Sequence, residues 1–122
     1  MPTARLAAIA LDCPDPRRLA EFWAAIIGGE IVLATDDHWI IRTDVLHVAA
    51  VRVPNHRPPS WPDGPVPKQM HLDLAVTDLL SAVADAVRLG AQESRHQPEP
   101  QLWRVMLDPA GHPFCLSTQM PD

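Results

Sequence analysis

Apolar and polar positions form a pattern that occurs twice along the chain. In each copy a short, mostly apolar segment, residues 6–13 or 70–76, precedes a longer segment with helical periodicity. Asp78 follows Asp15 by 63 positions, and Gly90 follows Gly28 by 62, so that the helical segments begin and end alike. Strands alternate with period two and helices with period 3.6, so the pattern predicts a duplicated strand–helix unit.

Local signals mark both ends of each predicted helix. Asp15 and Asp78 can accept hydrogen bonds from free N–H groups in the first turn, and Pro16 suits the first helical position. Gly28 and Gly90 end the helices. The apolar stripes expected to face the core are Leu19, Phe22, Trp23, Ile26 and Ile27 in the first helix and Leu79, Leu80, Val83 and Val87 in the second.

Further strand patterns follow each helix. The turn-forming sequence Asp108-Pro-Ala-Gly111 precedes the last of them. The chain therefore contains two βαβββ modules, about 5–54 and 69–118, and the fold class is α+β. The expected strands are residues 30–34, 39–43 and 46–53 in the first module and 91–94, 102–107 and 113–118 in the second.

Six prolines between residues 54 and 68 separate the two modules. Proline cannot donate to a strand ladder, so this stretch is interpreted as a stiff linker. Trp61 within it is expected to pack on the fold, either as part of a strap over the sheet or in plain linker packing. With 122 residues, the chain suits one compact domain spanning 1–122.

Charge and composition exclude several classes of partner. The net charge of −5 is dispersed, and no basic stripe suits nucleic acid. No segment approaches the roughly 20 apolar residues that span a membrane. Without a signal-peptide pattern we expect a cytoplasmic location, where Cys13 and Cys115 stay reduced.

Three motifs follow one another along the chain. They are Asp15-Pro16-x-x-Leu19-x-x-Phe22-Trp23 with Gly28, His71-Leu-Asp-Leu-x-Val76-x-Asp78 and Asp108-Pro-Ala-Gly-His-Pro113. Their order and spacing resemble the glyoxalase/bleomycin-resistance group, the vicinal oxygen chelate superfamily. The Trp-Pro linker before His71 and the closing Gly-His-Pro-Phe-Cys resemble a bacterial glyoxalase-like subgroup of it. The resemblance implies a cupped mixed sheet around a cavity, with the helices on the outer face.

Enzymes of that superfamily hold a divalent metal with His and Glu side chains from several strands. The His in the first strand of a module is matched by His71 in the second copy, but Ala8 stands there in the first. A Glu usual in the last strand is replaced by Cys115. A catalytic metal generally needs three protein ligands, so no metal cofactor is expected. If a divalent metal binds, the resemblance implies His71 with His47, Asp73 or Cys115.

Tryptophan is unusually frequent for a chain with no tyrosine. Trp39 and Trp103 begin strands at similar places in the two modules and face either the helices or the cup, and Trp61 could close a pocket. Strand alternation places His71 and Asp73 on one face, pointing into the cup. Two structural alternatives to ligand binding are that His71 only forms a hydrogen bond with Asp73 and that Cys115 is a small buried apolar residue. The candidate ligand contacts are Trp39, Trp61, Trp103, His71, Asp73 and Cys115.

Two functions fit these features. The first is a homodimeric protein that binds or sequesters a small aromatic or hydrophobic molecule and has a degenerate metal site. The alternative is a metal-dependent lyase, isomerase or ring-cleaving dioxygenase of the same superfamily. A third interpretation, an interaction module without a ligand, predicts a pocket filled by its own side chains.

Overall fold

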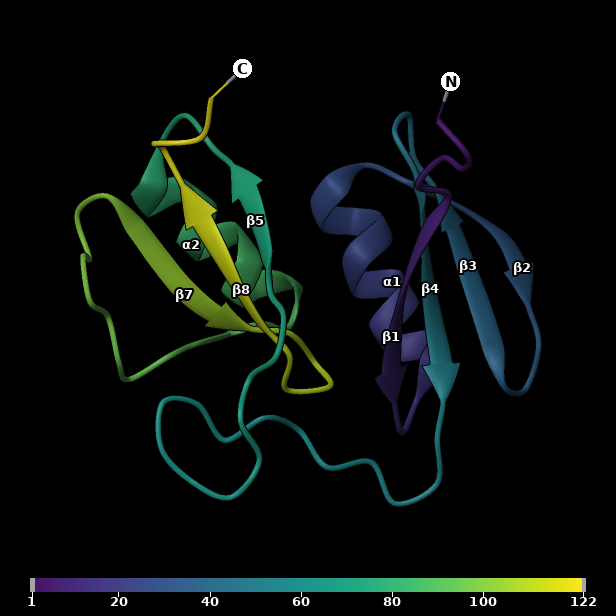
Figure 1. The fold of residues 1–122 in the computed structure, drawn as a ribbon. Helices are drawn as coiled ribbons and strands as arrows, with labels where there is room; N and C mark the ends of the chain where they lie inside the picture. The colour runs from purple at the N-terminus through teal and green to yellow at the C-terminus, as the bar shows by residue number, and fades with distance from the viewer. Residues whose placement is uncertain (1, 122) are drawn as a thin grey trace. The chain divides into compact units, whose positions relative to one another are not determined.

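The computed structural model describes residues 2–121, which divide into two compact units with a boundary near residue 56 (Figure 1). Each unit contains the element order strand, helix and three strands. The α+β class and the two βαβββ modules are therefore confirmed. Hydrogen bonding arranges the strands in two four-stranded sheets, one in each unit.

The first unit has the strand order β1-β4-β3-β2. Its first and last strands are parallel neighbours, whereas the other neighbouring pairs are antiparallel. The helix α1 packs against one face of this sheet. The elements are β1 (Ala8–Cys13), α1 (Pro16–Ile27), β2 (Glu30–Ala34), β3 (His38–Arg42) and β4 (His47–Arg52).

The second unit repeats this topology with the strand order β5-β8-β7-β6. Here too the first and last strands are parallel, and α2 packs against one face. β6 is only two residues long and forms the edge of the sheet. The elements are β5 (Leu72–Ala75), α2 (Leu79–Leu89), β6 (Gln92–Glu93), β7 (Trp103–Leu107) and β8 (Pro113–Ser117).

The caps of both helices are those that the sequence predicts. Asp15 accepts a hydrogen bond from the Arg18 backbone N–H at 3.2 Å, and Asp78 accepts one from the Ser81 N–H at 3.3 Å. Gly28 follows α1 with a φ of 75°, a left-handed conformation that glycine adopts without steric cost. These local interactions fix where each helix begins and ends.

The predicted apolar stripe of α1 is buried at Leu19, Phe22 and Trp23 and partly buried at Ile26 and Ile27, whereas that of α2 is partly wrong. Val83 is buried on α2, and Ala86, which the prediction omitted, has no exposed surface. Leu80 is 73% exposed and Val87 is 49% exposed. Successive side chains on a helix are rotated by about 100° about its axis, so Leu79, Val83 and Ala86 lie along one side of α2. This side is the buried stripe, and Leu80 lies outside it.

The proline-rich linker contains no helix or strand between Arg52 and Leu72. It nevertheless has defined internal contacts. The Ser60 N–H donates to the Val66 carbonyl at 2.7 Å, and the Val66 N–H donates to Ser60 Oγ at 3.0 Å. These bonds close residues 60–66 into a loop that belongs to the second unit.

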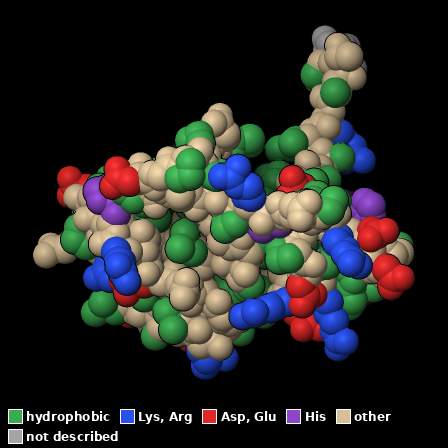
Figure 2. Space-filling view, turned by 90° about the horizontal axis from the view of Figure 1, so that it is seen from below, with side chains coloured by type: hydrophobic (Ala, Val, Ile, Leu, Met, Phe, Trp, Pro, Cys, Tyr) green, Lys and Arg blue, Asp and Glu red, His purple; other side chains and the backbone are tan. Residues whose placement is uncertain are grey.

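Charges are interspersed on the surface. On the face shown in Figure 2, acidic and basic side chains lie among one another and no continuous basic stripe is visible. Within residues 2–121, no helix is long and apolar enough to cross a bilayer. Cys13 and Cys115 are thiols and form no disulfide with each other.

Asp108 holds the turn before β8. Its carboxylate is buried and accepts hydrogen bonds from the Ala110 N–H at 2.9 Å and the His112 N–H at 3.0 Å. Gly111 completes the turn with a φ of 89°, and a Cβ there would lie 2.5 Å from the Cβ of Pro58. The turn therefore needs both the aspartate and the glycine.

Replacing Asp108 with alanine leaves two backbone donors without this acceptor. We expect Asp108→Ala to lower the free energy of unfolding by about 1–3 kcal/mol, measured by urea denaturation. Asp108→Asn keeps an oxygen acceptor and should retain most of that stability. Equal denaturation midpoints for Asp108→Ala and the wild type would contradict this assignment.

Candidate functional site

The parallel pairing of β5 with β8 brings the predicted site residues together. Asp73 lies directly opposite Cys115 in the register, and paired residues on neighbouring strands point to the same face. His71 precedes β5 by one residue and, by alternation, shares the face of Asp73. Leu72 and Leu74 point to the opposite face, where they lie beside the buried Phe114 and Leu116 of β8. The face with Asp73 and Cys115 is called the open face below.

His71, Asp73 and Cys115 form one compact cluster. His71 Nε2 lies 3.2 Å from Asp73 Oδ1, and one donor atom of each residue lies within 4.8 Å of the others. The side chains of His71 and Asp73 are 35% and 39% exposed, whereas Cys115 is buried. The cluster thus presents an imidazole and a carboxylate to solvent above a shielded thiol.

The surroundings of Cys115 favour the neutral thiol. Burial is the main cause that raises its pKa, and the negative charge of Asp73 raises it further. A hydrogen bond between the thiol and Asp73 acts in the same direction, while the positive charge of Lys68 opposes it. Because the reactive form of cysteine is the thiolate, these effects make Cys115 a weak nucleophile near neutral pH.

The donor atoms of the cluster suit Zn²⁺ better than Mn²⁺ or Mg²⁺. Imidazole, thiolate and carboxylate together can provide the three protein ligands typical of an open zinc site. Mn²⁺ and Mg²⁺ prefer oxygen donors, which the cluster supplies from Asp73 alone. In the described part of the chain, this cluster is where three such side chains converge.

The first sheet lacks this chemistry at the equivalent positions. β1 pairs with β4 in the register Ala8 with His47 and Ala10 with Ala49. The positions that correspond to His71, Asp73 and Cys115 are therefore Ala8, Ala10 and Ala49. His47 lies two residues before Ala49 and is therefore not the counterpart of Cys115. The sequence alone had left this alignment of His47 open.

Trp39, the second residue of β3, and Trp103, the first residue of β7, lie on different faces of their sheets. Trp103 pairs with Ser117 of β8 and points to the same face as Ser117. Cys115 lies two residues before Ser117 and therefore points to that face too, so Trp103 lies on the open face. Trp39 pairs with Ala50, which is buried on the face that α1 covers. The two tryptophans therefore differ by one position when the two sheets are aligned. Because side chains alternate with period two along a strand, this difference places them on different faces.

Trp39 and Trp61 line cavities of their own units. Trp39 borders a hollow of about 560 Å³ beside the start of α1, with Arg17 and Arg52. Trp61 borders a hollow of about 1030 Å³ beside β6. Neither cavity includes His71, Asp73 or Cys115.

Two neighbours of Trp61 were not among the predicted site residues. Lys68 Nζ lies 4.3 Å from the centroid of the Trp61 ring, and the His96 ring contacts it edge-on with centroids 5.1 Å apart. His96 carried no signal in the sequence, because a single histidine in a loop has no informative spacing. The expectation that Trp61 packs on the fold is confirmed by these contacts.

Comparisons with known proteins agree with this fold. The family model described as "Glyoxalase-like domain" matches residues 8–117, and the chain belongs to this family. The predicted membership of the vicinal oxygen chelate superfamily is thereby confirmed. A search of curated protein sequences found no match.

Solved structures with the same fold include proteins of defined chemistry. The fosfomycin resistance protein FosX from Mesorhizobium loti is 18% identical, with a TM-score of 0.71 over 98% of this chain and 94% of that one. A glyoxalase-related enzyme from Fulvimarina pelagi is 19% identical, with a TM-score of 0.68 over 93% and 86%. FosX from Listeria monocytogenes, in complex with Mn(II) and 1S,2S-dihydroxypropylphosphonic acid, is 13% identical, with a TM-score of 0.70 over 98% and 93%. At these identities the comparison establishes the fold.

The state of the Cys115 thiol can be tested by alkylation. Asp73→Asn removes a negative charge that raises the pKa of Cys115, so the thiolate fraction at pH 8.5 should increase. We expect iodoacetamide to modify Cys115 several-fold faster in this variant, measured by mass spectrometry of the Cys115 peptide. The exposed Asp85 on α2 provides the matched control Asp85→Asn, which should leave the rate unchanged. An unchanged rate in Asp73→Asn would show that its carboxylate does not act on the thiol.

Proposed function

We propose that the chain binds a small organic molecule through the open face of its second sheet. The observation that supports this proposal is the convergence of His71, Asp73 and Cys115 on a face that also carries Trp103. Small-molecule sites typically combine apolar or aromatic walls with a few convergent polar groups. In this site Trp103 would contact the apolar part of the ligand, and His71 and Asp73 would bind its polar group.

The differences between the two modules support binding rather than metal catalysis. Two of the family's metal positions carry Ala8 and Cys115 in this chain, in place of the usual His and Glu. A ligand held by hydrogen bonds and apolar contacts needs neither an activated water nor a thiolate. The raised pKa of Cys115 is compatible with such a role, because a neutral thiol can line a pocket as a small apolar group.

This proposal includes a homodimeric assembly and a cytoplasmic location for the protein. A homodimer is expected, because drug-binding members of the superfamily hold their ligand between two chains. The expected location is the cytoplasm. Contributions of Trp39 and Trp61 to this same ligand stay predictions.

Ligand binding can be measured through tryptophan fluorescence in a screen of small aromatic compounds. A compound that binds the open face should lose about tenfold in affinity with His71→Ala and with Trp103→Leu, since each removes one polar or aromatic contact. His38→Ala in the first unit removes an exposed histidine of β3 and should have no effect. Compounds that bind all four proteins equally would place the ligand elsewhere.

A metal-dependent enzyme of the same superfamily is the second candidate, and the three converging donors favour it. His71, Asp73 and Cys115 would hold the ion, with the thiol deprotonated on binding. Such an ion would act as a Lewis acid toward a substrate oxygen. The half-exposed His71 and Asp73 leave one side of the cluster accessible to a substrate.

Metal content distinguishes the two candidates. Under the binding proposal, protein soaked with Zn²⁺, Ni²⁺, Mn²⁺ or Fe²⁺ and then desalted should retain no stoichiometric metal that depends on His71. The measurement is elemental analysis of the wild type beside His71→Ala and the matched control His38→Ala. One metal ion per chain, lost only in His71→Ala, would favour the enzyme.

A further inference from the structure

The cavity beside β6 has the properties of a second binding site. Its volume of about 1030 Å³ is sufficient for a drug-sized molecule. Val87, Ala91 and Leu107 contribute an apolar surface, and Trp61 adds an aromatic wall. Val87 is 49% exposed, so its apolar side chain is accessible from the cavity.

Trp61 is held in place by contacts within the second unit. The Lys68 ammonium lies against its ring and the His96 ring packs edge-on against it. The hydrogen bonds between Ser60 and Val66 close the loop from which the indole extends. The indole is half-buried, so part of it is accessible from the cavity. A preorganised aromatic wall reduces the entropy cost of binding.

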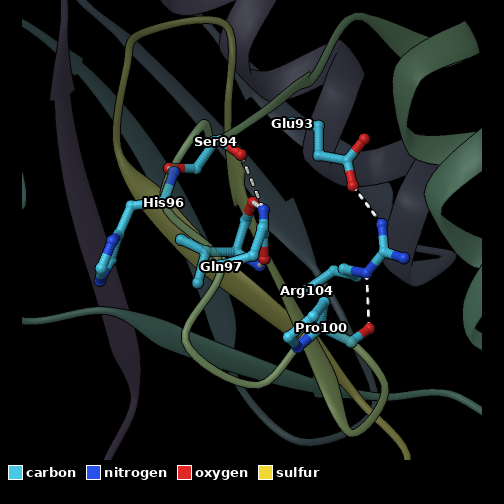
Figure 3. Close-up of polar contacts among 7 residues, drawn as sticks. Glu93, Ser94, His96, Gln97, Pro100 and Arg104 are labelled. Atoms are coloured by element: carbon cyan, nitrogen blue, oxygen red, sulfur yellow. Dashed lines mark hydrogen bonds and ion pairs between the residues drawn. The ribbon is translucent and has the colours of Figure 1, made fainter.

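The wall beside Trp61 is also fixed, although it belongs to the irregular segment after β6. The Gln97 amide donates to the carbonyls of Ser94 and Val105 at 2.9 and 2.8 Å and accepts from the Val105 N–H at 2.8 Å. Figure 3 shows Gln97 at the centre of this segment, with His96 pointing away from Gln97 and Arg104. These bonds tie Arg95 and His96, which flank the cavity, to β7.

The charges around the cavity favour an acidic ligand. Glu93 is paired with Arg104, which also donates to the Pro100 carbonyl at 2.6 Å (Figure 3). Arg95 lines the cavity, is exposed, and has no ion-pair partner within residues 2–121. Its planar guanidinium suits bidentate binding of a carboxylate or sulfonate. Lys68 lies outside the lining and adds a second cation beside Trp61, whereas Asp63 lines the cavity and opposes both cations.

We propose that this cavity binds a planar aromatic molecule that carries an acidic group. The ring packs against Trp61 and the apolar surface of Val87 and Leu107, and the acid binds Arg95. The site is distinct from the open face, because none of His71, Asp73 and Cys115 lines the cavity. The second unit thus contains two ligand sites.

The test uses 8-anilinonaphthalene-1-sulfonate, an aromatic sulfonate, titrated by fluorescence into the full chain. We expect Trp61→Leu and Arg95→Ala to weaken its binding by about tenfold each, and Asp63→Asn to strengthen it. Arg18→Ala, which removes an exposed arginine of α1 in the first unit, is the matched control and should change the affinity less than twofold. If Trp61→Leu disturbs the linker, Arg95→Ala still decides, because its side chain is exposed.

The location of the probe can be read from the indole N–H signals of the four tryptophans in a ¹⁵N NMR spectrum. Tryptophan-to-phenylalanine variants assign each signal. The proposal expects the signal of Trp61 to shift and those of Trp103 and Trp39 to stay. A shift of Trp103 without Trp61 would place the probe on the open face and overturn the proposal. Unchanged affinity in both Trp61→Leu and Arg95→Ala would overturn it as well.

Discussion

Each unit depends on the parallel pairing of its first strand with its last. In the second unit this pairing joins β5 to β8 across more than forty positions of sequence and encloses a helix and two strands. Its register sets Asp73 opposite Cys115, and strand alternation then adds His71 on the same face. A shift of β5 by one residue would turn His71 and Asp73 to the other face of the sheet and separate them from Cys115 on β8. The chemistry of the site is therefore a consequence of one strand register.

The parts of the fold that local interactions determine could be predicted from the sequence. Asp15 and Asp78 cap the helices, Gly28 and Gly90 follow them, and the prolines exclude strands from the linker. The grouping of His71 with Asp73 followed from strand alternation alone. The position of Cys115 beside them followed from the family resemblance, since the contact spans two distant strands.

Features set by tertiary packing could not be predicted. The faces of Trp39 and Trp103 depend on pairing registers that differ by one residue between the modules. The exposure of Leu80 and Val87 depends on how α2 rotates on its sheet, which the small Ala86 permits. The packing of His96 on Trp61 joins two irregular segments, for which no periodicity exists to be read.

The alanines at positions 8, 10 and 49 have a consequence for stoichiometry. A chain built from two similar modules could offer two equivalent sites, one on each sheet. Methyl groups at these positions supply neither protons nor lone pairs, so the first sheet has no counterpart of the polar cluster. A ligand that requires that cluster therefore binds with a stoichiometry of one per chain, although the chain contains two similar modules. The first module has alanine side chains where the second has its polar cluster, and His47, opposite Ala8, places an imidazole on that face of its sheet.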